Sequence, residues 1–451
     1  GSFKLAVKSP DKAILVFSYI GMKTQEIPVK GKKRIDVVMQ PDNQVLDEVV
    51  VIGYGTSKRS DLTGSVVSVK SEELMQTPTS DVSQALAGRV AGVSVMQSEG
   101  EPGASISIRV RGGISITQSN EPLYVIDGFP SEDGMNSLDP AEIETIDILK
   151  DASSTAIYGA RGANGVVVIT TKKGAKDGGK IQLSFDSYIG IKRIARQLPV
   201  LSTKEFVLLD YERSLAFKGE SGVTSFQQRY GSFRELDENY ANREGIDWQD
   251  EALGRVTTSQ NYRVNLTGGG KELKYNFSYS YFKDLGAMVY SGSDKHNVSL
   301  SVSHNPNKRF RANARFNYAQ TKVYGMGTSG STTNFNKMEH IIQYRPTVGI
   351  YGEDSDLLIG EDPLLEDDET NPMQSPLVSA AEETKKKLQR VLQVSGGFTF
   401  NFNKYLSFRN TIGFRYQNIR QDTFFGDESI TGKRSSINGT IQYNESGNFQ
   451  T

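Results

Sequence analysis

The chain has 451 residues, a formal net charge of −1 and no cysteine, which excludes disulfides, thiolate catalysis and cysteine-based metal sites. Its length indicates two or three domains, and its balanced charge gives no reason to expect nucleic acid as a partner. The best apolar run, Ala13–Ile20, is far shorter than the ~18 residues that a transmembrane helix requires. A membrane β-barrel is compatible with the negative mean hydropathy, because half of each barrel strand faces a polar lumen.

Residues 1–40 are expected to form short strands. The apolar and β-branched runs that predict them are Phe3–Val7, Ala13–Tyr19, Gln25–Pro28 and Arg34–Met39. Three or four strands can pair but cannot close a core between two sheets. We therefore expect part of a β-sandwich here.

The next segment, 41–56, reads PDNQVLDEVVVIGYGT, with Asp47 and Glu48 before the apolar run Val49–Ile52. Such a composition favours extended backbone and a short linker between domains. The alternative is a linker strand that packs on the N-terminal unit.

The run from Leu123 to Gly174 is the most informative part of the chain. Leu123–Ile126 predicts an apolar strand followed by an Asp127-Gly128 turn. Asp139 and Pro140 are a typical N-cap and first helical residue, so we expect a helix there, with Glu142 and Glu144 in its early turns. The β-branched run Val166–Thr170 predicts a strand buried on both faces. Together these elements indicate a compact α+β unit.

The amino-acid sequence of this run closely resembles the plug-domain signature of TonB-dependent outer-membrane transporters, specifically the SusC-type (SusC/RagA) family. Two earlier phrases, VSQALAGRVAGVSV at 82–95 and ISIRVRGGISI at 106–116, are also similar to plug motifs. The residues that match the signature are Leu123, Tyr124, Val125, Ile126, Asp127, Gly128, Lys150, Asp151, Tyr158, Gly159, Arg161, Gly162, Asn164 and Gly165.

The resemblance implies four regions. Residues 1–40 resemble the C-terminal part of a carboxypeptidase-regulatory-like β-sandwich, 41–56 a linker with the TonB box, 57–178 the plug, and 179–451 the first part of an outer-membrane β-barrel. In the family, the TonB box pairs edge-on with a strand of the periplasmic TonB protein. Here the corresponding residues are Asp47, Glu48, Val49, Val50, Val51 and Ile52.

Charged plug residues would lie inside a barrel lumen, where they must pair or be hydrogen-bonded. Asp127 is one, and Arg89, Arg109, Arg111 and Arg161 are candidates for ion pairs between plug and barrel. Ordinary ion pairs within the plug are equally compatible with the sequence.

After Gly179 the sequence pattern changes to long segments in which apolar and polar residues alternate, as in β-strands. Tyr275, Phe277 and Tyr279 share one face with Asn276 and Ser278 on the other, and three further segments alternate in the same way. We expect strands near 180–194, 256–267, 272–284, 295–304, 308–322, 387–402, 404–420 and from 435 onward. The pattern is typical of strands between lipid and a wet lumen, although a soluble sandwich also alternates.

The connections between these strands alternate between long and short, as in outer-membrane barrels with external loops and tight periplasmic turns. Segments 195–255 and 323–386 are the long ones. Plugged transporters contain about 22 strands, so we expect about eight strands here to be an incomplete antiparallel barrel.

No catalytic constellation is found, and we expect the protein not to be an enzyme. The histidines, His296, His304 and His340, have neither metal-ligand nor triad spacing. Gly325–Gly330 matches GxGxxG but enters a polar loop rather than a helix. The acidic segment Glu353–Glu369 could bind Ca²⁺ but lacks EF-hand spacing, so we expect a solvated loop and no cofactor.

Leu201–Lys218 is expected to be an amphipathic helix in the first long loop, with Ser202 or Thr203 as its N-cap. In the family, such loops contact a SusD-type surface lipoprotein that closes over the barrel. The resemblance implies TonB-dependent import of a large oligosaccharide or oligopeptide across the outer membrane of a Gram-negative, Bacteroidota-like bacterium. TonB with ExbB and ExbD, the lipoprotein and outer-membrane lipid would be the partners. An iron-siderophore or cobalamin receptor and a soluble β-rich binding or adhesion module are the alternatives.

Overall fold

A computed structural model describes most of the chain. The described residues are 14–17, 25–29, 37–38, 49–52, 55–58, 66–76, 79, 81–97, 100, 102–104, 106–110, 112, 119–131, 135–174, 181–325, 337–350, 352–359, 375–426, 429 and 440–450. The expected strand Phe3–Val7 and the Gly-rich stretch 326–330 lie outside them, and of 34–39 only 37–38 are inside.

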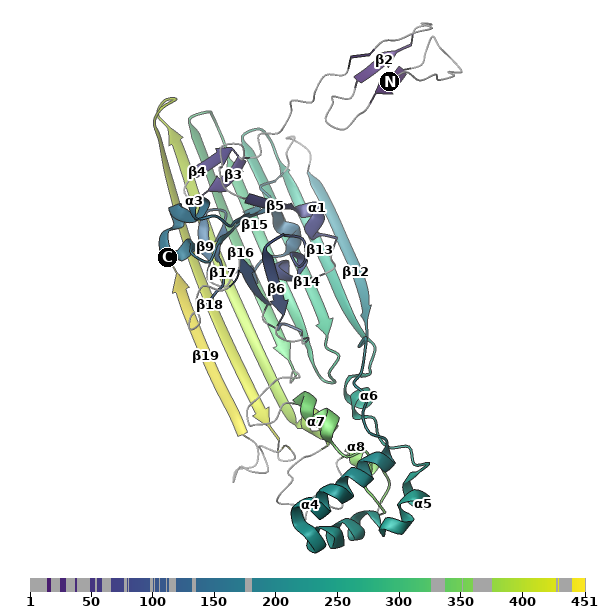
Figure 1. Cartoon of the computed structure of the whole chain (residues 1–451). Coiled ribbons are helices and arrows are strands. Elements are labelled where there is room, and N and C mark those ends of the chain that lie inside the picture. The colour runs from purple at the N-terminus through teal and green to yellow at the C-terminus, as the bar shows by residue number, and fades with distance from the viewer. Residues whose placement is uncertain are drawn as a thin grey trace.

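The largest element is an antiparallel sheet of eight strands that follow one another in chain order, here called the wall (Figure 1). All eight are close to the strands predicted from alternation, and the fold class is confirmed. They are β12 (Gln182–Lys192), β13 (Thr257–Gly269), β14 (Leu273–Leu285), β15 (Gly292–His304), β16 (Phe310–Tyr324), β17 (Glu383–Asn401), β18 (Ser407–Phe425) and β19 (Thr440–Gln450).

The two faces of the wall differ in polarity, as the alternation of polar and apolar residues predicts. On β16, Asn317 is 1% exposed whereas its neighbour Phe316 is 40% exposed. On β14, Ser278 is buried and Phe277 is exposed. The polar residues are the buried ones because they face the plug, and the apolar residues point away from it. This inside-out arrangement suits a sheet whose outer face contacts lipid.

The plug is a five-stranded sheet with the order β5-β10-β11-β8-β9. Its strands are β5 (Val66–Lys70), β8 (Leu123–Ile126), β9 (Phe129–Ser131), β10 (Ile143–Leu149) and β11 (Val166–Thr171). Strands β8 and β11 are parallel and the other pairs antiparallel. A separate hairpin, β6 (Val93–Gln97) with β7 (Ile106–Val110), and short helices α1 (Ser71–Leu74), α2 (Val82–Ala85) and α3 (Ala152–Thr155) complete it.

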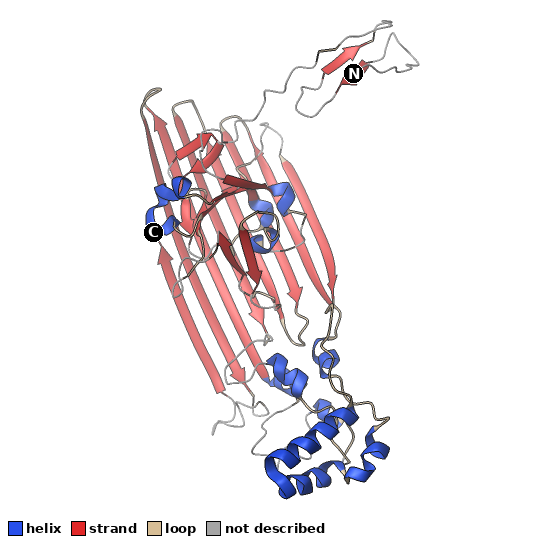
Figure 2. Ribbon diagram, in the orientation of Figure 1, coloured by secondary structure: helices blue, strands red, loops and turns tan. Residues whose placement is uncertain are grey.

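The plug core confirms that Val166–Thr170 is buried on both faces. Val167 and Ile169 pack into one apolar cluster, and Val166 and Val168 into a second one on the other side. Figure 2 shows this sheet and its helices lying against one face of the wall.

The expected helix after Asp139 is wrong. Asp139 does cap a turn, accepting a hydrogen bond from the Ala141 amide at 2.8 Å, but this turn is a 3₁₀ helix, η2, that covers only Pro140–Glu142. Strand β10 follows at once, between β5 and β11. The segment IETIDIL contains three isoleucines, and its pairing with a strand on each side outweighs the capping signal.

The two ends of the wall differ in their connections. At one end, the loop end, 193–256 and 325–382 include helices α4 (Thr203–Tyr230), α5 (Leu236–Tyr240), α6 (Trp248–Leu253), α7 (Lys337–Gln343), α8 (Asp356–Ile359) and α9 (Pro376–Glu382). At the other end, the turn end, strands are joined by three to five residues, at 270–272, 305–309 and 402–406. No helix in the described parts of the chain is both long enough and apolar enough to cross a membrane.

Helix α4 begins where it was expected. Ser202 is the N-cap, and it forms a capping box with Glu205. The helix is longer than expected because it continues past Lys218 through a kink at Gly219, where φ is +58°.

Two small hairpins precede the plug. Strand β1 (Ile14–Phe17) pairs with β2 (Gln25–Pro28), and β3 (Val49–Ile52) pairs with β4 (Gly55–Lys58). The assignment of 1–40 to part of a β-sandwich, and the domain boundaries at 40, 56 and 178, stay predictions.

Candidate functional site

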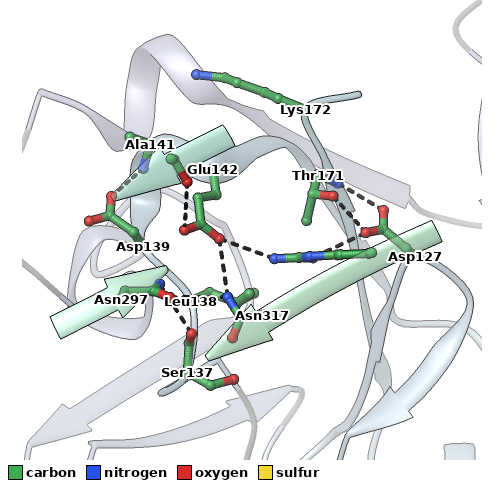
Figure 3. A network of polar contacts seen from close by, with 12 residues as sticks. Asp127, Ser137, Leu138, Asp139, Ala141, Glu142, Thr171, Lys172, Asn297 and Asn317 are labelled. Atoms are coloured by element: carbon green, nitrogen blue, oxygen red, sulfur yellow. Dashed lines mark hydrogen bonds and ion pairs between the residues drawn. The ribbon is translucent and has the colours of Figure 1, made fainter. Parts of the chain in front are cut away.

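A network of buried charges joins the plug to the wall (Figure 3). The plug supplies three carboxylates, Asp127, Asp139 and Glu142, and the wall supplies two guanidinium groups, Arg263 and Arg315. All five side chains are less than 10% exposed. Buried ion pairs of this kind need close geometry and further hydrogen bonds to offset desolvation.

Arg315, in the middle of β16, binds two of the carboxylates. Its Nη1 lies 3.1 Å from Asp127 Oδ2, and its Nη2 lies 3.1 Å from Glu142 Oε2. One residue of the wall therefore holds two segments of the plug that are separate in sequence.

Asp127 is positioned by the turn that the sequence predicts after β8. Its backbone is left-handed, with φ at +48°, a conformation that Asp tolerates better than most residues. The carboxylate accepts hydrogen bonds from the Thr171 amide at 3.0 Å and the Thr171 hydroxyl at 2.6 Å. These two hydrogen bonds fix Asp127 to β11 and so hold its carboxylate in place for the contact with Arg315.

Glu142 ends the η2 turn and points at the wall. Its Oε1 accepts from the Ser278 hydroxyl at 3.1 Å, and its Oε2 is 3.5 Å from the Asn317 amide nitrogen. Full burial raises the pKa of Glu142 to about 7, against the opposing effect of Arg315. The ion-pair distance alone would suggest a lowered pKa, but desolvation by burial outweighs the charge of Arg315 here.

Asp139 makes the third ionic contact. Arg263 on β13 donates to its Oδ1 at 2.6 Å, while the same oxygen caps η2. Polar contacts to plug backbone extend the network on either side. Asn297 and Lys295 of β15 donate to the carbonyls of Ser137 and Leu138, and Asn276 of β14 donates to the carbonyl of Lys172.

Of the charged plug residues named from the sequence, Asp127 contacts the wall. Arg89 donates to Gln76 within the plug at 3.2 Å, and Arg109 and Arg161 are exposed in this chain. Arg111 lies outside the described residues. The ion pairs of these four arginines with the barrel stay predictions.

The wall arginines were not singled out in the sequence, although a signal for them exists. Arg263 and Arg315 occupy the polar parity of otherwise apolar-alternating strands. An arginine at mid-strand on a face that is otherwise Asn and Ser needs a buried anion, and the plug turns contain the anions.

The remaining signature residues build the plug rather than the network. Tyr124, Val125 and Ile126 are core residues, Lys150 donates to the carbonyl of Ala91, and Asn164 donates to the carbonyl of Ser119 at 3.1 Å. Gly165 has φ at +92°, and a Cβ there would lie 2.9 Å from that of Val110, so the position requires glycine.

The segment predicted to be the TonB box forms β3, whose residues Val49–Ile52 pair with β4. Asp47 and Glu48 lie outside the described residues. In the described sheets β3 has β4 as its one partner strand, which leaves the other edge of β3 without a strand partner.

Two polar cavities lie between plug and wall, on either side of the ionic network along β16. A cavity of about 560 Å³ at the turn end is lined by Arg311 and Asn313, among others. A cavity of about 420 Å³ toward the loop end is lined by Ala319 and Thr321. Arg315 and Asn317 lie between these positions on the same face of the strand, so the network lies between the two cavities.

No cluster of acidic residues or histidines suited to a metal is found within the described ranges. Asp354 of the acidic loop accepts from Arg243 and Thr347 and so stabilises the loop helices. Residues 360–369 lie outside the described part, and Ca²⁺ binding there stays untested.

Comparisons with known proteins agree with this architecture. The family model of the TonB-dependent receptor plug domain matches residues 58–166. TonB-dependent receptor P3 of Formosa agariphila is 34% identical over 454 residues, which cover 99% of this chain and 42% of the relative. TonB-dependent receptor SusC of Bacteroides thetaiotaomicron is 36% identical over 340 residues, which cover 73% of this chain and 31% of the relative.

Among solved structures, the RagAB peptide importer in its open-open state superposes with a TM-score of 0.69 at 24% identity, over 89% of this chain and 46% of that chain. At this identity the likeness shows the fold. The chain thus spans less than half the length of the relatives that it matches. Its plug, its wall of antiparallel strands and its sequence identity with SusC and the Formosa receptor make this chain a member of the SusC-type TonB-dependent receptors.

Proposed function

We propose that the protein imports a large nutrient across the outer membrane, driven by TonB, without covalent chemistry. The observation that supports this most is the plug held by a buried ionic network between two polar cavities. A network of ion pairs can separate and re-form, so a plug held in this way can move and open a path between the cavities.

Energy would enter through β3. In strand addition, main-chain hydrogen bonds supply the affinity and the side chains need only be extended and modestly apolar. The Val-Val-Val-Ile sequence of β3 meets this requirement. TonB, with ExbB and ExbD, would pair with this segment on the periplasmic side, and the turn end of the wall would face the periplasm.

The loop end would then face the cell exterior and meet a SusD-like lipoprotein lid. Helix α4 and the loop 325–382 are the proposed contacts. The RagAB neighbours are described as a peptide importer, and the proposed cargo is accordingly an oligopeptide or an oligosaccharide.

The siderophore or cobalamin receptor is the second candidate. The sequence identity to SusC and the RagAB fold support the nutrient importer over it. The soluble binding module has less support, because large apolar residues of β12, such as Phe185 and Ile189, are more than 60% exposed on the outer face.

The test is native mass spectrometry of the full-length protein extracted gently from its own outer membrane. We expect co-purification with a lipoprotein and a bound glycan or peptide mass, together with uptake that stops in cells lacking TonB. A lone barrel bound to a metal chelate would replace this proposal with the siderophore receptor, and a protein that is a soluble monomer without detergent would refute transport.

A further inference from the structure

Three consecutive lysines stand near the start of β17, and they alternate between the faces of the wall. Lys386 is exposed, whereas Lys385 and Lys387 are half-buried on the plug side. Lys387 lines the loop-end cavity, and both Lys385 and Lys387 line a smaller adjoining space of about 100 Å³. The plug residues Pro102 and Gly103 line both spaces, so the two spaces adjoin along the plug.

Neither of the inward lysines has a hydrogen bond or ion pair from its ammonium group to any part of the chain that the structure describes. The other charged groups in these cavities are engaged. Lys192 pairs with Asp284, Lys295 donates to the Leu138 carbonyl, and Asp81 accepts from the amides of Ser83 and Gln84.

Among the described residues that line the combined space, four are lysines and two are aspartates, and both aspartates are occupied by other donors. The charge that these described residues give the space is therefore positive. Residues two apart on a strand have Cα atoms about 6.6 Å apart, so Lys385 and Lys387 place like charges side by side in a partly desolvated space. An anion bound between them would offset the repulsion of the two ammonium groups.

We propose that Lys385 and Lys387 form a binding site for anionic oxygens of the transported substrate. The amide side chains of Gln389 and Gln421, which line the same spaces, add neutral donors. The substrate class is then an acidic oligomer, with carboxylate or sulfate groups on sugars or with aspartate and glutamate side chains. This inference rests on the proposed function as an importer and deepens it.

The experiment measures binding by isothermal titration calorimetry to the full-length receptor with its lipoprotein, in detergent. Four probes of equal length separate the possible sources of the anion: hexagalacturonate, hexaglutamate, maltohexaose and a neutral hexapeptide. The variants are the double substitution Lys385→Gln with Lys387→Gln, and the control Lys386→Gln on the opposite face of the same strand. Melting curves verify that each variant is folded.

We expect one acidic probe to bind and the neutral probe of the same kind, sugar or peptide, to bind less tightly. The double variant should weaken acidic binding by about tenfold or more, as charge-assisted hydrogen bonds are lost, and added salt should weaken it in the wild type. The Lys386→Gln variant should bind within about twofold of the wild type, in line with small surface effects.

The proposal is overturned if neither acidic probe binds, if a neutral probe binds as tightly as its acidic counterpart, or if Lys386→Gln has the same effect as the double variant. Its failure can be distinguished from failure of the import proposal. A receptor that takes up a neutral oligomer in a TonB-dependent manner would refute the anion site and leave the transport function intact.

Discussion

At the scale of single residues, Arg315 is the wall side chain that binds two plug carboxylates. Replacing it with glutamine would leave Asp127 and Glu142 buried without their cation, and breaking a buried pair in this way costs about 3–5 kcal/mol. We therefore expect Arg315→Gln to lower the urea concentration at which the plug becomes sensitive to protease.

The matched control is Arg311→Gln, on the same strand and face but lining the turn-end cavity. It should change stability by less than about 0.5 kcal/mol. Equal effects of the two substitutions would contradict the role assigned to the network.

Glu142 makes the stability of the plug depend on pH. Its pKa is about 7 in the folded protein, against an ordinary value of 4.5 for a glutamate side chain, so the folded state binds the proton more tightly. Stability should fall as pH rises from about 4.5 to about 7, by roughly 3 kcal/mol, and change little from this cause above that range.

Glu142→Gln mimics the protonated carboxyl and should flatten this pH profile, measured as the midpoint of plug unfolding between pH 5 and 8. Glu73→Gln, at an exposed position of α1, should retain the wild-type slope. A Glu142→Gln profile as steep as that of the wild type would show that other groups cause the dependence.

Contacts between individual side chains were the feature that the sequence predicted least well. Asp127 could be singled out because its turn follows a clear apolar strand. Its partner Arg315 is 188 residues away, and without the register of the wall nothing in the sequence selects Arg315 over Arg311 on the same face. Pairings across such distances depend on where the plug sits, which local patterns do not encode.

At the scale of elements, β3 is the segment proposed to pair with TonB. Val50→Pro removes a backbone donor and restricts the strand. We expect it to abolish TonB-dependent uptake while the protein still assembles in the outer membrane, as measured by transport assays and by surface labelling.

Ser57→Pro is the informative control, because Ser57 pairs with Val50 in the β3–β4 hairpin. It disturbs the same hairpin but leaves the sequence of β3 and its backbone donors unchanged, so uptake should persist. Loss of uptake in Ser57→Pro as well would mean that the hairpin, rather than the sequence of β3, is what transport needs; normal uptake in Val50→Pro would place the TonB box elsewhere.

The elements of the wall were predictable, and β10 was not. A period of two along 11 to 19 residues is a strong local signal, and turn residues mark each strand end. Before β10, by contrast, Asp139 and Pro140 indicate the start of a helix. Strand β10 follows instead, because it pairs with β5 and β11 on either side. Capping chemistry is local, whereas a central strand is determined by its neighbours.

At the scale of the whole molecule, the wall has an apolar outer face and a polar inner face. Phe316→Arg places a charge on the outer face near the middle of β16, where an arginine in a transmembrane barrel costs about 2–4 kcal/mol. We expect reduced assembly into the outer membrane, measured by the heat-modifiable mobility of the folded barrel in gels.

Asn313→Arg, three residues earlier but facing the turn-end cavity, should assemble normally. Normal assembly of both variants would argue against lipid contact at Phe316. The overall architecture could be anticipated because alternation and loop length repeat along the chain, but the position of the plug against the wall could not, since it depends on contacts between the two.

The position of β5 in the plug sheet has a mechanical consequence. Strand β5 is at the edge and pairs with β10 alone among the described strands, and it is the first strand of this sheet along the chain. Tension applied from the N-terminal side therefore loads this edge first, and an edge strand can be peeled away one hydrogen bond at a time. The three carboxylates of the ionic network come later in the chain, from Asp127 onward.

The part of the plug before Asp127, here called the leading part, is therefore held less firmly than the part from Asp127 onward, which the ionic network attaches to the wall. Thr79, Gln84, Gln97 and Ile106 of the leading part line the loop-end cavity. Extraction of that part would enlarge this cavity before the contacts of Arg315 separate. Separation of those contacts would then join the two cavities, so the path would open in two steps of increasing load.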